Sequence, residues 1–479
     1  MPKRTVLLTG ASGLMGTEAF QELLRRRDQI DIVLLLLPLA AIRRAFSRYA
    51  GLAGVRIVWG SVCDPPSVGE AVRNADHVLH VAALTPPAAD HQPGLCGKVN
   101  FEGTRNILDA LRARPGGFGD TSLVYVSSVA VYGDRLPPAH MISVGDPVRP
   151  SLGDFYATTK ARSEREIIES GMTRWAILRQ TYIAIPRTLS LMSPLMFHQP
   201  LDTHIELITS RDAGFGVVQT IEAPDDFYGR VYNMGGGPSC RVVYRDYMDR
   251  VLPLAGVGPS SRVMRRNWFA LRNFHCGWYA DGADLNAYLG HQRSTLDDHY
   301  RDIAAALPAA LKFGARVAPA FLVRAYLKRM ADPPKWIRDG DDEKITAFLG
   351  SREAWEQIPP WDQGPDPRLG QGAFEAAPRP SPLEVRESMP GMQSLAATRG
   401  GICLSAEYAG ERAVLGWRCG FGHEWKASPT LVRAGHWCPE CVAPPWNYDE
   451  VATADPALAR LHHLNHGAGE RQVVARPSG

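Results

Sequence analysis

The chain has 479 residues, 45% of them hydrophobic and 22% charged, so its length favours two or three domains and its composition excludes a largely disordered protein. Lysine and arginine (53) nearly balance aspartate and glutamate (50), which excludes a general attraction to nucleic acid or to an anionic membrane. Eight cysteines are too few for a disulfide framework in so long a chain. Four of them lie near the C-terminus, which indicates a metal site.

The apolar run at the N-terminus is too short for a secretory signal, because a glycine turn follows it at once. The longest apolar run, residues 33–42, is interrupted by Pro38 and has about half the length of a membrane span. We therefore predict a cytoplasmic protein with no transmembrane segment.

In the first part of the chain, short apolar runs alternate with amphipathic stretches. Helices are predicted at residues 14–27, 101–112 and 155–170, and strands at residues 5–9, 32–37, 55–59, 77–82, 123–127 and 175–178. Strands that are apolar throughout and separated by helices are typical of a parallel sheet covered on both faces. The predicted fold class is α/β, with a doubly wound, Rossmann-like parallel sheet.

The later part of the chain divides by composition. Residues 1–260 are predicted to form the main α/β domain, whose insertions build a smaller, mostly helical substrate region. The four segments that follow are a helical extension (261–350), a linker rich in proline and glycine (351–392), a zinc-binding module (393–446) and a C-terminal tail (447–479).

A glycine-rich turn, TGASGLMG at 9–16, lies between the first predicted strand and the first predicted helix. Gly10 permits the tight turn, Gly13 lets backbone N–H groups approach a pyrophosphate, and Gly16 lets the helix pack close to the sheet. Such turns also occur for packing reasons alone. The position at the first strand of an alternating chain favours nucleotide binding.

Further along the chain, the residue types of hydride transfer occur in order. Ser128 ends a predicted strand, and Tyr156 and Lys160 lie four apart on one face of a predicted helix. A nearby ammonium lowers the pKa of a phenol, and a serine hydroxyl can hold the substrate oxygen while the tyrosine transfers its proton. Each residue taken alone fits an ordinary structural role, but the ordered set indicates chemistry.

These motifs resemble the extended short-chain dehydrogenase/reductases, in the NAD-dependent epimerase/dehydratase branch. The matching segments are TGASGLMG at 9–16, HVAA at 80–83, VNFEGTRNIL at 99–108, VSSVAVYG at 126–133 and YATTK at 156–160. The resemblance implies catalytic roles for Ser128, Tyr156 and Lys160. It implies that NAD or NADP is held by Gly10, Ser12, Gly13, Leu14, Met15, Gly16, Ser61, Val62, Ala82, Ala83, Asn100, Tyr156, Lys160 and Thr181.

Three departures from the family pattern bear on the cofactor and the substrate. Ser61 stands where the family usually has an aspartate that grips adenine, and Gln180-Thr181-Tyr182 replaces the family's proline and glycine positions beside the nicotinamide. The second strand ends without the acid that reads a ribose diol. Because Arg43 and Arg44 follow shortly after it, we slightly favour NADP over NAD.

The sequence thus predicts an NAD(P)-dependent oxidoreductase that acts on a secondary alcohol or carbonyl of a small molecule, with an epimerase or dehydratase cycle left open. The alternative is a non-catalytic nucleotide sensor whose zinc module binds a protein or nucleic-acid partner. His198 and His275 fall in the substrate region, where a structural role is favoured for each. Residues 312–328 are amphipathic and basic; packing on the main domain is favoured over attachment to lipid. A homodimer is left open.

The C-terminal cysteines form a C-x3-H and a C-x2-C pair, in which Cys419, His423, Cys438 and Cys441 are typical of a tetrahedral zinc site. The stretch resembles small treble-clef or zinc-ribbon modules. Four protein ligands leave no open position, so the zinc is predicted to be structural; Cys403 and His436 are the weaker rival ligands. Basic and acidic residues are equally frequent from 400 to 445, which disfavours nucleic acid. A protein-docking or stabilising role, separable from catalysis, is favoured.

Overall fold

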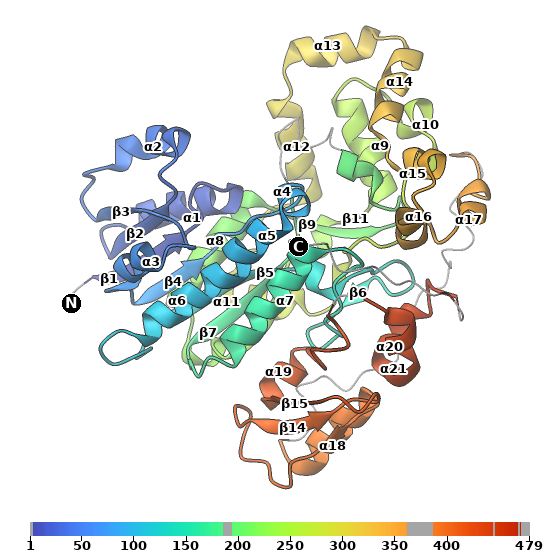
Figure 1. Ribbon diagram of the computed structural model, residues 1–479. Helices are drawn as coiled ribbons and strands as arrows, with labels where there is room; N and C mark the ends of the chain where they lie inside the picture. Colours follow the sequence, from blue (N-terminus) through green and yellow to red (C-terminus); the bar gives the residue numbers. More distant parts are fainter. Residues whose placement is uncertain (1–2, 185–193, 362–386, 444–445, 468–469, 471–479) are drawn as a thin grey trace.

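The computed structural model describes residues 3–184, 194–361, 387–443, 446–467 and 470 (Figure 1). Its centre is a seven-stranded parallel sheet with the order β10-β7-β5-β4-β1-β2-β3. The strands are β1 (Arg4–Thr9), β2 (Ile30–Leu36), β3 (Val55–Trp59), β4 (His77–His80), β5 (Ser122–Ser128), β7 (Trp175–Gln180) and β10 (Arg230–Met234). The chain turns back between β1 and β4, so the prediction of a doubly wound sheet is confirmed.

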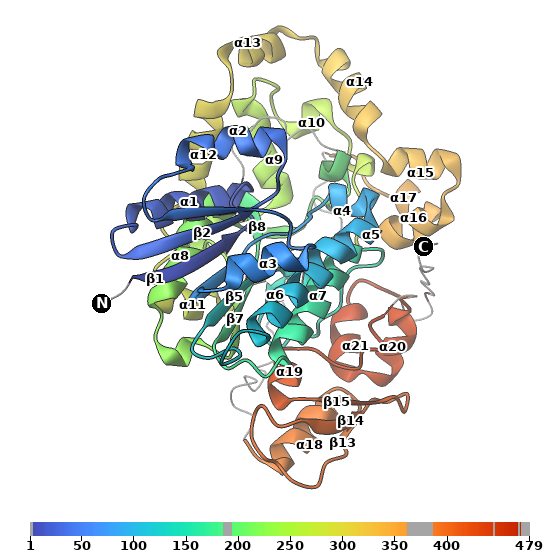
Figure 2. The same cartoon turned by 60° about the vertical axis from the view of Figure 1, so that its left-hand side comes forward.

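Helices cover both faces of this sheet (Figures 1 and 2). On one face α1 (Leu14–Arg25) packs against α8 (Ser210–Gln219), with α11 (Gly282–Leu289) beside β10. The other face carries α3 (Pro65–Val72), α6 (Gly103–Arg112) and α7 (Phe155–Ile168). The helix α2 (Ala40–Phe46) follows β2. Buried strands between two helical layers explain why the strands are apolar throughout.

The substrate region combines helices with two small sheets. One sheet has the order β11-β9-β8, formed by β8 (Tyr182–Ala184), β9 (His204–Thr209) and β11 (Arg241–Val243). The other pairs β12 (Trp278–Tyr279) with β6 (Met141–Ile142). The helices are α4 (Ala88–His91), α5 (Pro93–Cys96), α9 (Tyr244–Leu254), α10 (Ser260–Val263), α12 (Leu296–Ala306), α13 (Ala309–Val317), α14 (Ala320–Met330), α15 (Pro333–Asp339), α16 (Asp342–Leu349) and α17 (Arg352–Glu356). None of the described helices is long and apolar enough to cross a bilayer.

The C-terminal part begins with α18 (Met389–Thr398) and a three-stranded antiparallel sheet of β13 (Ile402–Cys403), β14 (Leu415–Arg418) and β15 (Glu424–Ala427). α19 (Pro429–Arg433) follows. The region expected as a tail contains α20 (Tyr448–Ala454) and α21 (Pro456–His462). Both helices begin at side-chain caps, because Asn447 accepts from the Glu450 backbone N–H and Asp455 from that of Leu458.

One buried apolar cluster runs from the helical layer of the main sheet into the C-terminal module. It joins Ile167 and Met172, at the end of α7 and just after it, to Trp417, Leu431 and Trp437 of the module. The module therefore packs against α7, with α19 near that helix (Figure 1). Most of the linker predicted at 351–392, residues 362–386, lies outside the described residues.

Candidate active site and metal centre

The glycine turn after β1 fits closely against the end of β4. Gly10 has a φ of +76°, and a Cβ there would lie 2.6 Å from the backbone nitrogen of Ala82. A Cβ on Gly16 would lie 2.0 Å from the carbonyl oxygen of Gly10. Side chains are therefore excluded at both positions, which leaves the backbone of the turn open to a phosphate group.

A single cavity of about 1550 Å³ extends from this turn across the carboxyl ends of the strands to α16. Its wall contains every residue predicted to bind the cofactor except Asn100, and it also contains Ser128. The glycine turn and these residues fit a dinucleotide. Arg43 and Arg44 are exposed on α2 and do not belong to the described wall.

Asn100 lies one layer behind the wall. Its Oδ1 accepts a hydrogen bond of 2.7 Å from the backbone N–H of Leu84, and its Nδ2 donates one of 3.1 Å to Oγ1 of Thr159. The side chain thereby ties the loop after β4 to α7. The amide of Asn100 therefore holds two parts of this wall together.

The inner face of α7 carries Tyr156 and Lys160. Asp154 caps the helix, because its Oδ1 accepts from the backbone N–H of Ala157 at 2.8 Å. The Nζ of Lys160 donates to the carbonyl oxygen of Val126 on β5 at 2.7 Å. Ser128 ends that same strand. Cap, helix and strand therefore place the three predicted catalytic side chains in one wall of the cavity.

Burial is the largest influence on the protonation of the tyrosine and the lysine. It lowers the pKa of Lys160 to about 7 and raises that of Tyr156, an effect that hydrogen bonding with Ser128 opposes. The sequence argument expected the ammonium to lower the phenol pKa, whereas in the structure both neutral forms are favoured. A neutral phenol is a proton donor at neutral pH.

The substrate end of the cavity holds two histidines that the sequence analysis singled out. His275 Nδ1 lies 3.0 Å from Oδ2 of Asp154, and His198 Nε2 lies 2.8 Å from Oδ2 of Asp332. Both histidines line the cavity. This end also contains the aromatic and methionine side chains Met196, Tyr244, Tyr247, Met248, Phe274 and Phe348, together with the polar residues Gln199, Asn273, Asp332, Glu343 and Lys344.

A buried carboxylate lies one helical turn beyond Lys160. Glu164 accepts hydrogen bonds from Ser127 Oγ, from Arg179 Nη2 at 2.7 Å and from His436 Nε2 at 2.9 Å. Burial alone would raise its pKa, but the charge of Arg179 and the hydrogen bonds from His436 and Arg179 lower it to about 2. Sequence reasoning missed Glu164 and Arg179, because only the three-dimensional packing shows that they are buried together.

The C-terminal module makes further contacts with β7, with α7 and with the loop around Val148. Arg179 Nη2 donates to the carbonyl oxygen of Ala434, and Arg165 Nη2 to that of Trp437, each at 2.8 Å. The backbone N–H of Val148 donates to the carbonyl oxygen of Gly435 at 2.9 Å. A Cβ on Gly435 would lie 2.0 Å from the Asp146 carbonyl oxygen, so the two backbones approach as closely as glycine allows.

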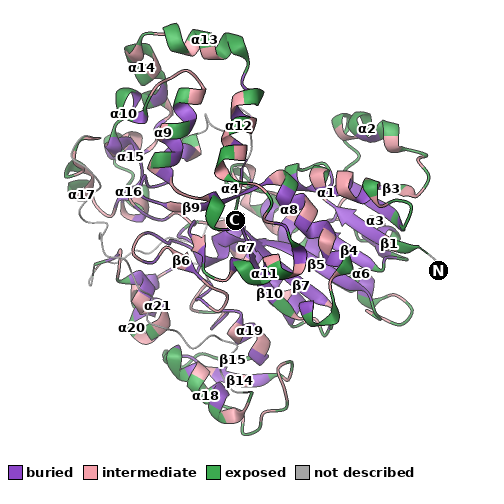
Figure 3. Ribbon diagram, turned by 180° about the vertical axis from the view of Figure 1, so that it is seen from behind, coloured by how far each residue is buried: buried purple, intermediate pink, exposed green. Residues whose placement is uncertain are grey.

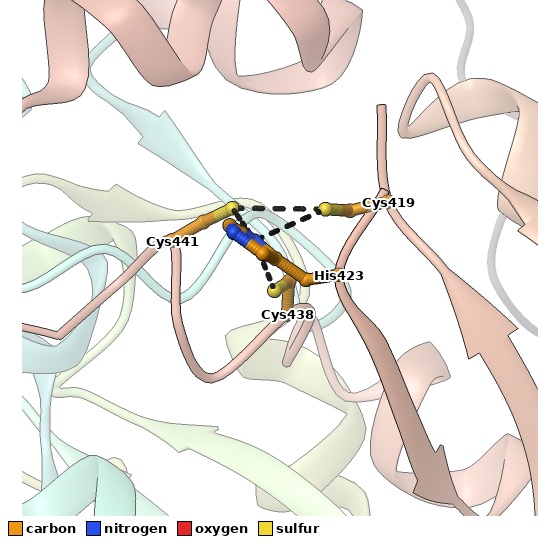
Figure 4. Close-up of side chains that lie close together, drawn as sticks. All are labelled: Cys419, His423, Cys438 and Cys441. Carbon is orange, nitrogen blue, oxygen red and sulfur yellow. Dashed lines mark hydrogen bonds between the residues drawn. The ribbon is translucent and has the colours of Figure 1, made fainter. Parts of the chain in front are cut away.

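The four predicted zinc ligands come together at the edge of the module (Figure 4). His423 Nδ1 lies 3.5 Å from the sulfurs of Cys419 and Cys441 and 3.6 Å from that of Cys438, and the Cys419 and Cys441 sulfurs are 3.9 Å apart. A tetrahedral zinc with ligand distances of about 2.0–2.3 Å has edges of roughly 3.5–3.8 Å, so the donor set fits. The rival His436 contacts Glu164, and Cys403 lies outside this group.

A second group of potential ligands, Asp449, His462 and His466, lies close together near α21. The guanidinium of Arg149 is 3.0 Å from Nδ1 of His462, and the His462 and His466 rings stack with centroids 4.0 Å apart. A permanent positive charge beside a ring nitrogen opposes cation binding, so this group is better explained as packing.

Comparisons with known proteins agree with this geometry. Residues 7–176 match the 3-beta hydroxysteroid dehydrogenase/isomerase family. A UDP-N-acetyl-alpha-D-glucosaminuronate decarboxylase of Bacillus cytotoxicus is 30% identical over 28% of this chain and 40% of its own length. The 3 beta-hydroxysteroid dehydrogenase type 7 of Mus musculus is 27% identical over 36% of this chain and 45% of its own length. The chain thus matches less than half the length of these curated relatives.

Among solved structures, a dTDP-glucose 4,6-dehydratase from Bacillus anthracis, in complex with NAD, superposes with a TM-score of 0.51 at 14% identity. The superposition covers 63% of this chain and 96% of that one. This likeness agrees with the predicted fold, which the sheet order already establishes.

The buried lysine should make stability depend on pH. Burial holds the pKa of Lys160 at about 7 in the folded chain, whereas the unfolded chain regains the ordinary value of 10.5. Between these values only the unfolded state binds the proton, so the free energy of unfolding rises with pH, by up to about 1.4 kcal/mol per unit. Urea unfolding between pH 7.5 and 9 should show this rise in the wild type relative to Lys160→Met. Parallel profiles of the two proteins would contradict it.

The Glu164 carboxylate should contribute much more to the free energy of unfolding than a surface charge does. Glu164→Gln leaves the buried guanidinium of Arg179 without its counter-charge, which should lower the free energy of unfolding by about 3–5 kcal/mol. Glu166→Gln, two residues further along the same helix and not fully buried, is the matched control and should cost less than about 1 kcal/mol. Equal losses in the two variants, measured by chemical unfolding, would show that the cluster is not a stabilising centre.

Proposed function

We propose that this chain, whose nucleotide-binding part belongs to the extended short-chain dehydrogenase/reductases, is an NAD(P)-dependent oxidoreductase acting on a secondary alcohol or the corresponding carbonyl. The observation that carries this proposal is the common cavity wall of Ser128, Tyr156, Lys160 and the glycine turn. That wall lies at the carboxyl ends of the strands, where doubly wound sheets bind their ligands.

In the proposed reaction, the nicotinamide supplies or accepts the hydride when it is bound. In the reducing direction, the carbonyl carbon takes the hydride and the carbonyl oxygen takes the phenolic proton of Tyr156. Ser128 holds that oxygen by a hydrogen bond. The negative charge of the remaining phenolate favours the protonated form of Lys160, which is held against β5 by Val126 and stabilises the phenolate in that form. Oxidation of an alcohol reverses each step.

We propose an uncharged substrate. The described wall of the cavity contains no arginine, and its only lysines are Lys160 and Lys344. Asp332 and Glu343 lie near the same end as Lys344 and add negative charge. A diphosphate would lack the bidentate partners that phosphate recognition ordinarily uses, whereas the aromatic and methionine side chains suit an apolar alcohol or ketone.

The proposed metal is one structural zinc on Cys419, His423, Cys438 and Cys441, whose spacing fits four-coordinate geometry. The face of the module that bears Trp437 is already used against α7, which supports a stabilising role over a partner-docking role. Thiolate ligands suit a reducing compartment, so the proposal retains a cytoplasmic location.

The catalytic proposal makes Tyr156 indispensable for proton transfer. Tyr156→Phe should lower kcat by about 10²-fold or more and leave cofactor affinity within a few-fold of wild type, because only the transferable proton is lost. Tyr182→Phe, another tyrosine of the same cavity, is the control and should keep activity within about tenfold. Assays with a panel of apolar alcohols and ketones measure kcat, and cofactor titration measures the affinity. Turnover of Tyr156→Phe near the wild-type rate would remove it from the mechanism.

The cofactor proposal favours NADP. Leu37 lines the cavity after β2 without an acid to repel a 2′-phosphate, and Arg43 lies on α2 with its guanidinium 4.5 Å from the Trp59 ring centroid. Fluorescence titration should give tighter binding of NADP than of NAD. A double variant Arg43→Ala/Arg44→Ala should weaken only NADP. A clear preference of the wild type for NAD would overturn this choice.

A further inference from the structure

The helices α13 and α14, together the α13–α14 segment, follow one another around a bend and project from the rest of the protein (Figure 1). Each begins directly after a proline, Pro308 or Pro319. No residue of α13 is buried, although more than half of its residues are apolar, and Figure 3 shows it mainly in the colour of exposed residues. An apolar helix in this position leaves hydrophobic surface in water unless something covers it.

The exposed apolar side chains of the molecule concentrate on the α13–α14 segment. Phe313 is 69% exposed, Phe321 68% and Val317 61%. Six of the fifteen large hydrophobic side chains that are exposed among the described residues lie here: Leu311, Phe313, Val317, Phe321, Leu322 and Tyr326. Single exposed apolar residues are ordinary, but a contiguous group of them marks an interaction surface.

The charge of this segment is one-sided. Residues 303–331 contain no aspartate or glutamate, and their basic residues are Lys312, Arg316, Arg324, Lys328 and Arg329. The whole chain is nearly balanced at +3, so this sign is a local feature. Aromatic and aliphatic side chains interleaved with basic ones are the composition of helices that lie in the interface of an anionic bilayer.

A small number of contacts join the α13–α14 segment to the rest of the protein. Leu327 of α14 is buried and belongs to the core of the substrate region, and α14 contacts α10. Arg324 Nη2 donates to the Arg262 carbonyl oxygen at 2.6 Å. Lys312 likewise reaches the Ala304 carbonyl oxygen at 2.5 Å. These contacts anchor both helices to the protein and leave Phe313 and Phe321 largely exposed.

We propose that the α13–α14 segment attaches the protein to the surface of an anionic lipid bilayer. Phe313, Val317 and Phe321 enter the boundary between headgroups and acyl chains, and the exposed basic side chains of both helices meet the lipid phosphates. The proposal commits to lipid because the segment is uniformly basic, whereas a second copy of the same basic face would repel it. It does not depend on the catalytic proposal.

The test is cosedimentation of the full chain with vesicles at physiological salt. The protein should cosediment with vesicles of phosphatidylcholine that contain about 30–40% phosphatidylserine, because their surface is negatively charged. Pure phosphatidylcholine vesicles should bind it at least about tenfold more weakly, and added salt should weaken the binding to anionic vesicles.

Two variants separate the apolar and the charged contributions. Phe313→Ser/Phe321→Ser should abolish binding, and Arg316→Gln/Lys328→Gln/Arg329→Gln should weaken it by about fivefold per charge removed. The matched controls are Val414→Ser and Arg73→Gln/Arg412→Gln, which alter exposed residues elsewhere and should bind as the wild type does. All substituted side chains are exposed, so thermal unfolding midpoints should stay at the wild-type value.

Two results would overturn the proposal. One is that the wild type fails to bind anionic vesicles, or that both variants of the α13–α14 segment bind them as well as the wild type does. The other is that size-exclusion chromatography shows a wild-type dimer that Phe313→Ser/Phe321→Ser converts to a monomer, which would make this face an interface between copies of the chain.

Discussion

The buried carboxylate of Glu164 is the interaction on which the site and the C-terminal module both depend. It lies one turn after Lys160 in α7. It accepts hydrogen bonds from Ser127 of β5, Arg179 of β7 and His436 of the module. An ionised group without partners in a protein interior costs several kcal/mol, so strand, helix and module must assemble together. The position of α7 is thereby defined by β5, β7 and the module together.

This arrangement gives the C-terminal module a structural role beside the main domain. Its sheet and short helices place Ala434 against Arg179 of β7 and place His436 and Trp437 against α7, and a metal on the adjacent Cys438 and Cys441 would hold that segment in shape. Zinc would then act on catalysis through the helix position, at a distance from the substrate. The apolar cluster shared by module and main domain points the same way.

Local patterns in the sequence predicted much of this structure, while the contacts between distant segments could not be read from it. The strand at 55–59 has the predicted limits, and the helices predicted at 14–27 and 155–170 begin at the predicted residues, because periodicity and turn residues determine such elements locally. The C-x3-H and C-x2-C spacings likewise identified four side chains whose donor atoms lie close together. The short strands β8 and β9 gave no clear period, and the pairing of Glu164 with His436 joins residues 272 positions apart. The composition of residues 351–392 predicted a separable module, but composition describes the connecting chain and says nothing of the surfaces that pack.

Hydrogen exchange on the full-length protein before and after zinc removal by a chelator tests the central claim most directly. If the module and α7 form one unit, removal of the metal should speed amide exchange at least about tenfold both in residues 415–441 and in α7, with α1 unchanged as an internal reference. Faster exchange confined to the module, with α7 as protected as before, would contradict the account and make the module an independent appendage.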